Sequence, residues 1–332
     1  MTTSTDPREL IQALVDNVEK VIIGKRSSVE LGVIALIGGG HALIEDVPGV
    51  GKTLLARSIA RSTGSKFKRL QFTPDLLPSD VTGVSVYNQK TNDFEFRPGP
   101  IMAEIVLADE VNRATPKTQS ALLEAMEEGQ ITVDGVTYEL PQPFMVLATQ
   151  NPIEYEGTFP LPEAQLDRFF LRISLGYPDP DQEVAVMNSH LTSEPIKELE
   201  PIATPGDIVR LQQAVRTVFI DDLVKQYIVA LSNSTRDHVD IALGVSPRAS
   251  LAMMRGSQAR ALMEGRDYVV PDDVKTIAAP VMSHRLILTP AARMREATGN
   301  TLVAEVLDMT PVPGAGSGTR SQASASRVGI DK

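Results

Sequence analysis

The chain has 332 residues, of which 42% are hydrophobic and none is cysteine, and its formal net charge is −10. A length of about 150 residues per domain predicts roughly two domains, and the lack of cysteine excludes a disulfide framework, a thiolate metal site and a cysteine nucleophile. The four histidines are scattered along the sequence, and the negative charge disfavours non-specific binding to nucleic acid or anionic lipid.

The amino terminus, MTTSTDPRELIQ, has no basic segment followed by an apolar stretch, so it does not have the pattern of a signal peptide. The most apolar run, residues 31–44, is interrupted by Gly38, Gly39, Gly40 and His41 well short of the ~20 apolar residues that a membrane span needs. We therefore expect a cytoplasmic protein without a membrane span.

Strands and helices alternate over the first half of the chain. A helix is predicted to begin at Pro7 after the capping residue Asp6. Short apolar runs predict strands at 41–45, 67–72, 104–110, 144–151 and 169–175, and helical patterns lie between several of them, notably at 52–64 and 118–129. Such alternation predicts a parallel sheet in an α/β domain.

Two segments have a different pattern. Residues 81–97 and 129–140 each alternate apolar and polar residues on both sides of a turn, at Asn92-Asp93 and Asp134-Gly135, so they predict β-hairpins inserted into the α/β core.

Helical patterns replace strand patterns after about residue 178. We therefore predict an α/β core at 1–178, a linker rich in proline and acidic residues at 179–204, and an all-helical second domain at 205–309. In the second domain Ser246 and Pro247 are predicted to begin a helix that Gly265 ends. The Pro/Gly/Ser/Ala-rich tail at 310–332 is predicted to be disordered.

The stretch EDVPGVGKT at 45–53 lies between a predicted strand and a predicted helix, which is the context of a phosphate-binding loop. Gly49 and Gly51 let backbone N–H groups approach phosphates, Lys52 can reach the β- and γ-phosphates, and the Thr53 hydroxyl can bind Mg²⁺. The usual pattern has glycine in place of Asp46. We expect Asp46 to replace that glycine at the bend that ends the strand, because aspartate tolerates turn conformations and can bond nearby backbone N–H groups.

An apolar strand that ends in two acids supplies the groups that a phosphate loop lacks. Asp109 is predicted to hold the Mg²⁺, and Glu110 to orient and deprotonate the attacking water. Asn151 ends the next predicted strand and can reach the γ-phosphate or the water, although many strands end in a polar residue. Arg168 and Arg248 are each compatible with a surface role, and spacing alone assigns neither a function.

Five motifs in order resemble the AAA+ ATPases, and among them the MoxR type, over residues 6–309. They are PGVGKT (48–53), LADEVNRA (107–114), ATQNP (148–152), EAQLDRF (163–169) and GVSPRA (244–249). The resemblance implies ATP and Mg²⁺ as cofactors, and an AAA+ core with a parallel sheet and inserted hairpins, followed by a small helical lid.

The resemblance also implies roles for individual residues. Glu110, Asn151, Arg168 and Arg248 correspond to the Walker B glutamate, the sensor 1 residue, an arginine finger that acts on the neighbouring subunit, and the sensor 2 arginine. Thr53 and Asp109 correspond to the residues that bind the metal. Nucleotide contacts are implied for Val21, Ile22, Gly24, Pro48, Gly49, Val50, Gly51, Lys52, Thr53 and Leu54.

A finger that acts across an interface implies assembly, and proteins of this type form rings, which we expect to be hexameric. They act on partner proteins in a chaperone-like way, in metal or cofactor insertion or in the maturation of complexes, and are associated with von Willebrand factor A domain partners. The alternative is a DNA-dependent motor or loader of the same fold. It is disfavoured because 129–140 contains no basic residue, while Lys90 and Arg97 of the first hairpin are balanced by Asp93 and Glu95.

Overall fold

The computed structural model describes residues 6–151, 158–189, 191 and 194–313. Its centre is a five-stranded sheet in the order β2 (Phe67–Gln71), β5 (Ile105–Asp109), β8 (Met145–Gln150), β1 (Ala42–Glu45) and β9 (Leu171–Ile173). All four strand pairs are parallel. The predicted parallel α/β core is therefore confirmed.

Helices cover both faces of this sheet because its central strands are apolar throughout and alternate residues face opposite sides. Ile105 and Leu107 of β5 pack in the cluster that includes α1 (Pro7–Glu19), α2 (Arg26–Ile37) and α3 (Lys52–Ser62). Val106 and Ala108 pack on the other face, in the cluster that includes α5 (Pro116–Glu128).

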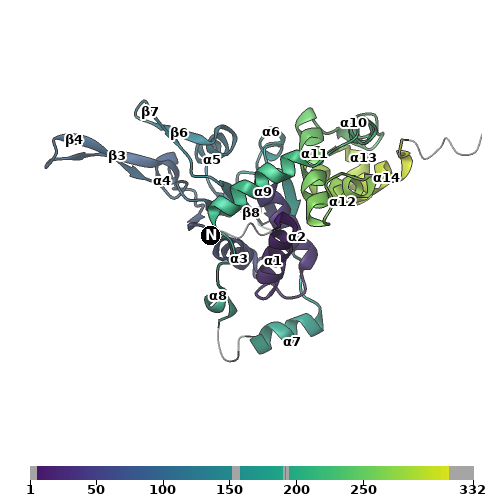
Figure 1. The fold of residues 1–332 in the computed structure, drawn as a ribbon. Helices are drawn as coiled ribbons and strands as arrows, with labels where there is room; N and C mark the ends of the chain where they lie inside the picture. The colour runs from purple at the N-terminus through teal and green to yellow at the C-terminus, as the bar shows by residue number, and fades with distance from the viewer. Residues whose placement is uncertain (1–5, 152–157, 190, 192–193, 314–332) are drawn as a thin grey trace, which may run out of the picture.

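Both predicted hairpins are present and project from the core (Figure 1). The first is formed by β3 (Gly83–Asn88) and β4 (Asp93–Pro98) after the short helix α4 (Pro78–Thr82), and the second by β6 (Gln130–Val133) and β7 (Val136–Glu139). The rings of Phe96 and Tyr138 stack at a centroid distance of 4.1 Å and so join the two hairpins.

The segment 179–204 contains two helices, α7 (Pro180–Ser189) and α8 (Pro195–Glu198). It leaves the carboxyl end of β9 and later contacts α1 and α3. Asn17 Nδ2 of α1 donates to the carbonyl oxygen of Glu200 at 3.0 Å, and Ile202 N donates to that of Ser62, at the end of α3, at 2.9 Å. The chain thus passes from the carboxyl edge of the sheet to the end of α3 before α9 (Pro205–Thr217) begins.

The region that follows is helical, as predicted. Helix α9 crosses the core, and the elements after it lie on the opposite side of the core from the hairpins (Figure 1). Its remaining elements are α10 (Asp222–Arg236), β10 (Ile241–Leu243), α11 (Pro247–Met263), α12 (Pro271–Met282), η2 (Ser283–Arg285), β11 (Ile287–Leu288), α13 (Pro290–Met294) and α14 (Gly299–Met309). The small antiparallel ribbon of β10 and β11 was not predicted from the sequence.

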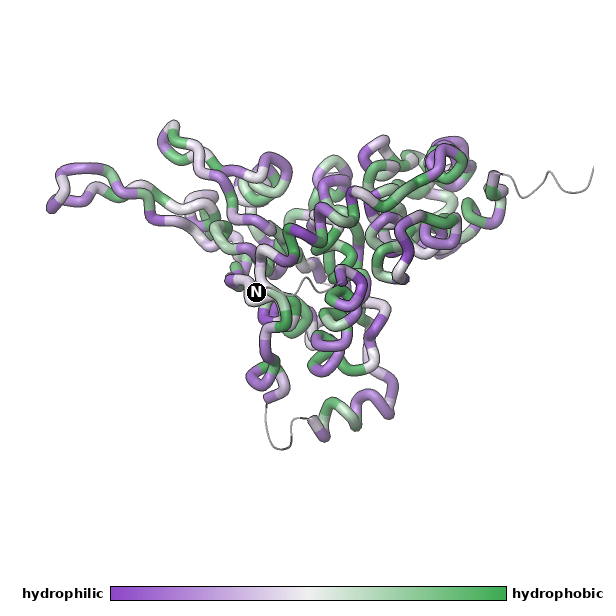
Figure 2. The backbone as a smooth tube through the Cα atoms, in the orientation of Figure 1, coloured by the Kyte–Doolittle hydropathy of each residue, from purple (hydrophilic) through white to green (hydrophobic). Residues whose placement is uncertain are grey.

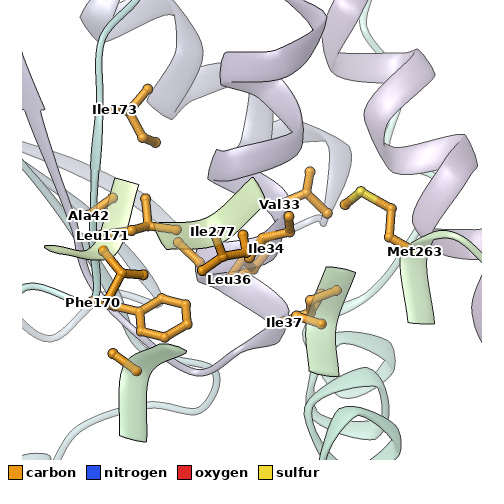
Figure 3. Close-up of a cluster of buried hydrophobic side chains, with 14 of the residues drawn as sticks. Val33, Ile34, Leu36, Ile37, Ala42, Phe170, Leu171, Ile173, Met263 and Ile277 are labelled. Carbon is orange, nitrogen blue, oxygen red and sulfur yellow. The ribbon is translucent and has the colours of Figure 1, made fainter. Parts of the chain in front are cut away.

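The lid and the core share one hydrophobic cluster. Ile277 of α12 and Met263 of α11 lie among α2 side chains and Phe170, which precedes β9 (Figure 3). A Cβ at Gly40 would lie only 2.4 Å from Cβ of Phe170, so glycine is needed for this close approach. The hydrophobic segments are concentrated in the packed elements, whereas the tip of the β3–β4 hairpin is hydrophilic (Figure 2).

No helix in the described part of the chain is both long and apolar enough to cross a membrane. The part of the predicted tail from residue 314 onward lies outside the described residues, as does Pro152 of the ATQNP motif.

Candidate nucleotide-binding site

The carboxyl edge of the sheet brings together the polar residues that follow its strands. In the pairing register, Gln71 of β2 lies opposite Asp109 of β5, and Glu45 of β1 lies opposite Gln150 of β8. Asn151 therefore follows β8 beside the start of the phosphate loop, where it is 6% exposed. In open α/β sheets this edge is where ligands bind.

The phosphate loop has the backbone that its two glycines predict. Gly49 and Gly51 have φ angles of +86° and +98°, and a Cβ built at either position has no atom within 4 Å, so open space adjoins both residues. Lys52 begins α3 and its Nζ donates to the carbonyl oxygen of Asp46 at 2.6 Å. The loop and the first turn of α3 thus form an open cradle at the positive end of a helix.

Asp46 bonds a nearby backbone N–H group, as expected, but it also bonds residues that were not predicted as its partners. The φ angle of Asp46 is not positive, so the residue does not adopt a left-handed conformation. Its carboxylate accepts hydrogen bonds from residues far along the chain. Oδ2 accepts from the N–H groups of Leu175 and Gly176, both at 2.7 Å, and from Ser174 Oγ at 3.1 Å. Oδ1 accepts from Val47 N at 2.9 Å. Asp46 thereby fastens the phosphate loop to the segment after β9.

The ionisation of Asp46 follows from these contacts. Burial acts to raise its pKa, but the hydrogen bonds from Gly176, Val47, Leu175 and Ser174 outweigh burial and hold the pKa below its ordinary value. The carboxylate is therefore charged at neutral pH and acts as an acceptor only.

Asp109 and Glu110 are held in place by Thr149 of β8. The Thr149 hydroxyl donates to Asp109 Oδ1 at 2.6 Å and accepts from Glu110 N at 2.8 Å. Glu110 adopts a left-handed conformation (φ +56°, ψ +49°), which non-glycine residues rarely adopt and which is found at functional sites. One hydroxyl thus orients both acids.

Strand β2 supplies further partners for these acids. Arg69 donates to Asp109 Oδ2 from Nε at 2.9 Å and from Nη2 at 2.6 Å, and Gln71 Nε2 donates to Glu110 Oε2 at 2.6 Å. Arg113, in the turn after β5, forms a 2.9 Å ion pair with the same Glu110 oxygen. Both acids are therefore already engaged by cationic or amide groups.

Thr149, Arg69 and Gln71 were not predicted from the sequence as residues of the site. Arg69 and Gln71 are two residues apart on β2, so their side chains project from the same face of this strand. Strand β2 pairs with β5, which carries Asp109. Thr149 precedes Asn151 by two residues. Polar residues near the carboxyl ends of neighbouring strands were the signal available for all three.

The segment expected to contact the base lies next to α3. Val21 packs with Ile196 and Leu199 of the α8 region and against Leu54 of α3. Ile22 is buried, and Gly24 has a φ of +71°. Gln182 of α7 donates from Nε2 to the Gly24 carbonyl oxygen at 3.2 Å, so α7 contacts this segment, in which Gly24 is exposed.

Arg168 and Arg248 lie together, and both bind Glu127 near the end of α5. Arg168 Nη1 lies 2.8 Å from Glu127 Oε2 and donates to the Leu123 carbonyl oxygen at 2.9 Å, while Arg248 Nη2 pairs with Glu127 Oε1. The cavity that both arginines line is also lined by Gly38–His41, which precede β1.

The phosphate loop follows β1, so the arginine pair and the loop lie toward opposite ends of this strand. Four residues at about 3.3 Å each correspond to about 13 Å of strand. The structure therefore brings Arg248 to Arg168 rather than to the phosphate loop of its own chain.

Comparison with known proteins agrees with this architecture. Residues 41–171 match the model of the ATPase family associated with various cellular activities (AAA), and residues 233–306 match the AAA lid domain. A putative ATPase from Cytophaga hutchinsonii has a similar solved structure, with a TM-score of 0.86 at 38% identity over 92% of this chain and 96% of that one.

Two curated proteins are similar over most of their length. The uncharacterized protein YeaC of Bacillus subtilis is 52% identical over 94% of this chain and 98% of its own, and chaperone MoxR1 of Mycobacterium tuberculosis is 40% identical over 91% of this chain and 82% of its own. At these levels of identity and coverage, with both family models matched in order, the chain belongs to the AAA+ ATPases of the MoxR type.

Proposed function

We propose that this protein hydrolyses ATP with Mg²⁺ in an oligomeric ring and uses the energy to remodel or activate partner proteins. The described residues fit both cofactors. Gly49 and Gly51 leave open space in the loop, and the Thr53 hydroxyl and the Asp109 carboxylate are the oxygen ligands that Mg²⁺ prefers.

The residues have distinct tasks in this proposal. Pro48 to Leu54 would bind the phosphates, with Lys52 as the cation, while Val21, Ile22 and Gly24 would contact the base. Glu110 would orient a water and accept its proton, and Asn151 would position that water or the terminal phosphate. Bound ATP would supply the phosphoryl group transferred to water, and bound Mg²⁺ would neutralise phosphate charge.

The observation that carries the ring is the pairing of Arg168 and Arg248 on Glu127, away from the phosphate loop of the same chain. Arginines that stabilise charge on a transferred phosphoryl group must contact it, and contributions of ~10³–10⁵ in rate are typical of such fingers. Both arginines would therefore act together on the nucleotide of the neighbouring subunit, and hydrolysis would require assembly. A hexamer is the expected ring.

Mixing inactive variants tests this arrangement. Arg168→Ala lacks the finger but keeps a complete phosphate loop, and Lys52→Ala lacks the loop cation but keeps the finger. Mixed rings of the two should recover Mg²⁺-dependent ATPase activity, whereas mixtures of Lys52→Ala with the double variant Lys52→Ala/Arg168→Ala should not. No recovery in mixtures that assemble by light scattering would count against action between subunits, and a wild-type protein without ATPase activity would overturn the enzymatic proposal.

A protein client is favoured by the surface of the hairpins. Tyr87 and Phe94 pair across β3 and β4 with a centroid distance of 5.4 Å, and Phe94 is 68% exposed. Val136 at the turn of the second hairpin is 52% exposed. Exposed apolar groups of this kind suit contact with polypeptide, whereas a DNA-tracking hairpin requires basic residues toward phosphate.

A von Willebrand factor A domain protein is the partner that we propose for the ring. A DNA-dependent motor remains the alternative, and stimulation of the ATPase by DNA at physiological salt distinguishes the two. We expect no such stimulation. We also expect that a Glu110→Gln ring, which would retain ATP, binds its client more weakly when Tyr87 and Phe94 are both replaced by alanine.

A further inference from the structure

A positively charged cavity lies at the junction of the core and the lid. It encloses about 400 Å³ and is lined by Arg168, Arg216, Arg248, Arg255 and Arg285, together with the carboxylates of Glu127 and Asp167. Five arginines against two acids leave an excess of positive charge. This excess lies outside the phosphate loop and was not anticipated from the sequence.

Three of the five arginines are paired with acids of the cavity wall. Arg168 and Arg248 share Glu127, and Arg285, whose side chain is 3% exposed, pairs with Asp167 at 2.8 Å. Asp167 also accepts a hydrogen bond from Ser246 at the start of α11 at 2.8 Å. Both acids of the lining are therefore fully engaged.

The other two arginines have no acidic partner among the described residues. Neither Arg216 at the end of α9 nor Arg255 in the middle of α11 forms an ion pair there, and Nε of Arg255 is shielded from solvent without a hydrogen-bond partner. Burial, and then the charge of Arg216, lower the pKa of Arg255. Arg216 is exposed and Arg255 is half-buried, so the cost of holding the two like charges falls mainly on Arg255, and an anion bound between them would reduce it.

We propose that Arg216 and Arg255 bind the phosphate groups of a nucleoside polyphosphate in this cavity. Guanidinium groups match phosphate oxygens with paired hydrogen bonds, and two guanidinium groups that line one cavity favour a ligand with several negative charges. Leu251 and Met254 line the same cavity, so it offers apolar surface beside the cations, and its volume is within the range of small-molecule sites.

The ligand has two possible sources. One is free nucleotide, which would make the cavity a second nucleotide site of each subunit. The other is the nucleotide held by the phosphate loop of a neighbouring subunit, and this source rests on the proposed function because it requires the ring. In that case Arg216 and Arg255 would extend the contact made by Arg168 and Arg248.

The first measurement uses full-length Lys52→Ala protein, in which the phosphate loop no longer binds nucleotide. Binding of the non-hydrolysable analogue AMP-PNP is followed by titration calorimetry, alone and with Arg216→Gln or Arg255→Gln added. If free nucleotide is the ligand, AMP-PNP binds this background, and each added substitution weakens binding about tenfold or more because a hydrogen-bonded charge is lost.

The second measurement uses protein with Lys52 intact and follows assembly with AMP-PNP by light scattering. If the neighbour's nucleotide is the ligand, Arg216→Gln and Arg255→Gln each raise the AMP-PNP concentration needed for assembly about tenfold or more. The nucleotide affinity of the dilute, unassembled chain stays unchanged. Changes below threefold in both measurements would overturn the proposal.

Two controls separate ligand binding from folding. Arg293→Gln removes an exposed lid arginine outside the cavity and should alter neither measurement. Because Arg255 is half-buried without an acidic partner, Arg255→Gln should leave the melting temperature of the ligand-free protein equal or higher. A fall of several degrees would mean that Arg255 stabilises the fold, and would contradict the proposal. The first measurement does not depend on ATPase activity, so it can fail or succeed independently of the proposed function.

Discussion

Asp46→Gly tests the role that the structure gives to the first residue of the phosphate loop. The substitution removes the acceptor of four hydrogen bonds. Leu175 N is buried and would be left without a partner, at about 1–3 kcal/mol, while the donors of Val47, Ser174 and Gly176 are half-buried or exposed and regain water at about 0.5 kcal/mol each. Adding about 0.5–1 kcal/mol for the freedom of glycine in the unfolded chain, we expect a loss of roughly 3–5.5 kcal/mol.

Urea unfolding measures this loss, and binding of AMP-PNP reports on the loop. Affinity should fall, because the Asp46 carbonyl that accepts from Lys52 Nζ would no longer be anchored to the segment after β9. Asp46→Asn is the matched control: it keeps one oxygen acceptor in place and should lose about half as much stability. A Gly variant within 1 kcal/mol of the wild type, with unchanged affinity, would refute the anchoring role.

Three further predictions concern the core and the hairpins. Burial lowers the pKa of His41 to about 4. Between pH 6.5 and pH 4 the unfolded chain therefore binds a proton at this residue that the folded chain does not, so the free energy of unfolding should decrease by about 1.4 kcal/mol for each unit by which the pH is lowered. In urea titrations His41→Asn should show a pH slope smaller by that amount, and an equal slope would contradict the assignment. Thr149→Val removes the hydroxyl between Asp109 and Glu110 and should lower the ATPase rate about 10- to 100-fold at nearly unchanged ATP affinity. The control Thr149→Ser should keep most of the rate. Equal losses of rate in both variants would argue against a role of the hydroxyl in orienting the two acids. The stacked rings of Phe96 and Tyr138 should contribute about 1 kcal/mol to stability, which a double-mutant cycle of Phe96→Ala with Tyr138→Ala measures as a coupling energy. If the stability losses of the two substitutions are additive, the stack does not link the hairpins.

Local patterns in the sequence were sufficient for the core elements and for the hairpins. The apolar runs at 104–110 and 144–151 became adjacent parallel strands, and Asp134-Gly135 forms the turn between β6 and β7 with φ angles of +50° and +81°. Strand alternation and turn chemistry are local properties, so they can be recognised from neighbouring residues.

Contacts between distant segments were beyond such patterns. Asp46 was interpreted from its neighbours in sequence, yet two of its donors are Leu175 and Gly176, which are brought to it by the pairing of β1 with β9. Arg69 likewise meets Asp109 only because β2 pairs with β5 in a particular register. Hydrophobic periodicity indicates which residues lie in strands, but it does not specify which strands are neighbours.

The position of Arg248 shows the same limit at the scale of a domain. Its helix begins with Ser246 and Pro247 as the sequence predicts, but the location of that helix depends on the path of residues 174–204. This path leaves β9 at the phosphate-loop edge and follows α3, so the lid packs at the opposite edge, through Phe170 and Ile277 (Figure 3). Sequence order alone does not show whether Arg248 would reach a nucleotide on its own chain or on another one. Its pairing with Arg168 on Glu127, at the edge of the sheet opposite the phosphate loop, is the reason to look for its phosphate partner on a neighbouring subunit.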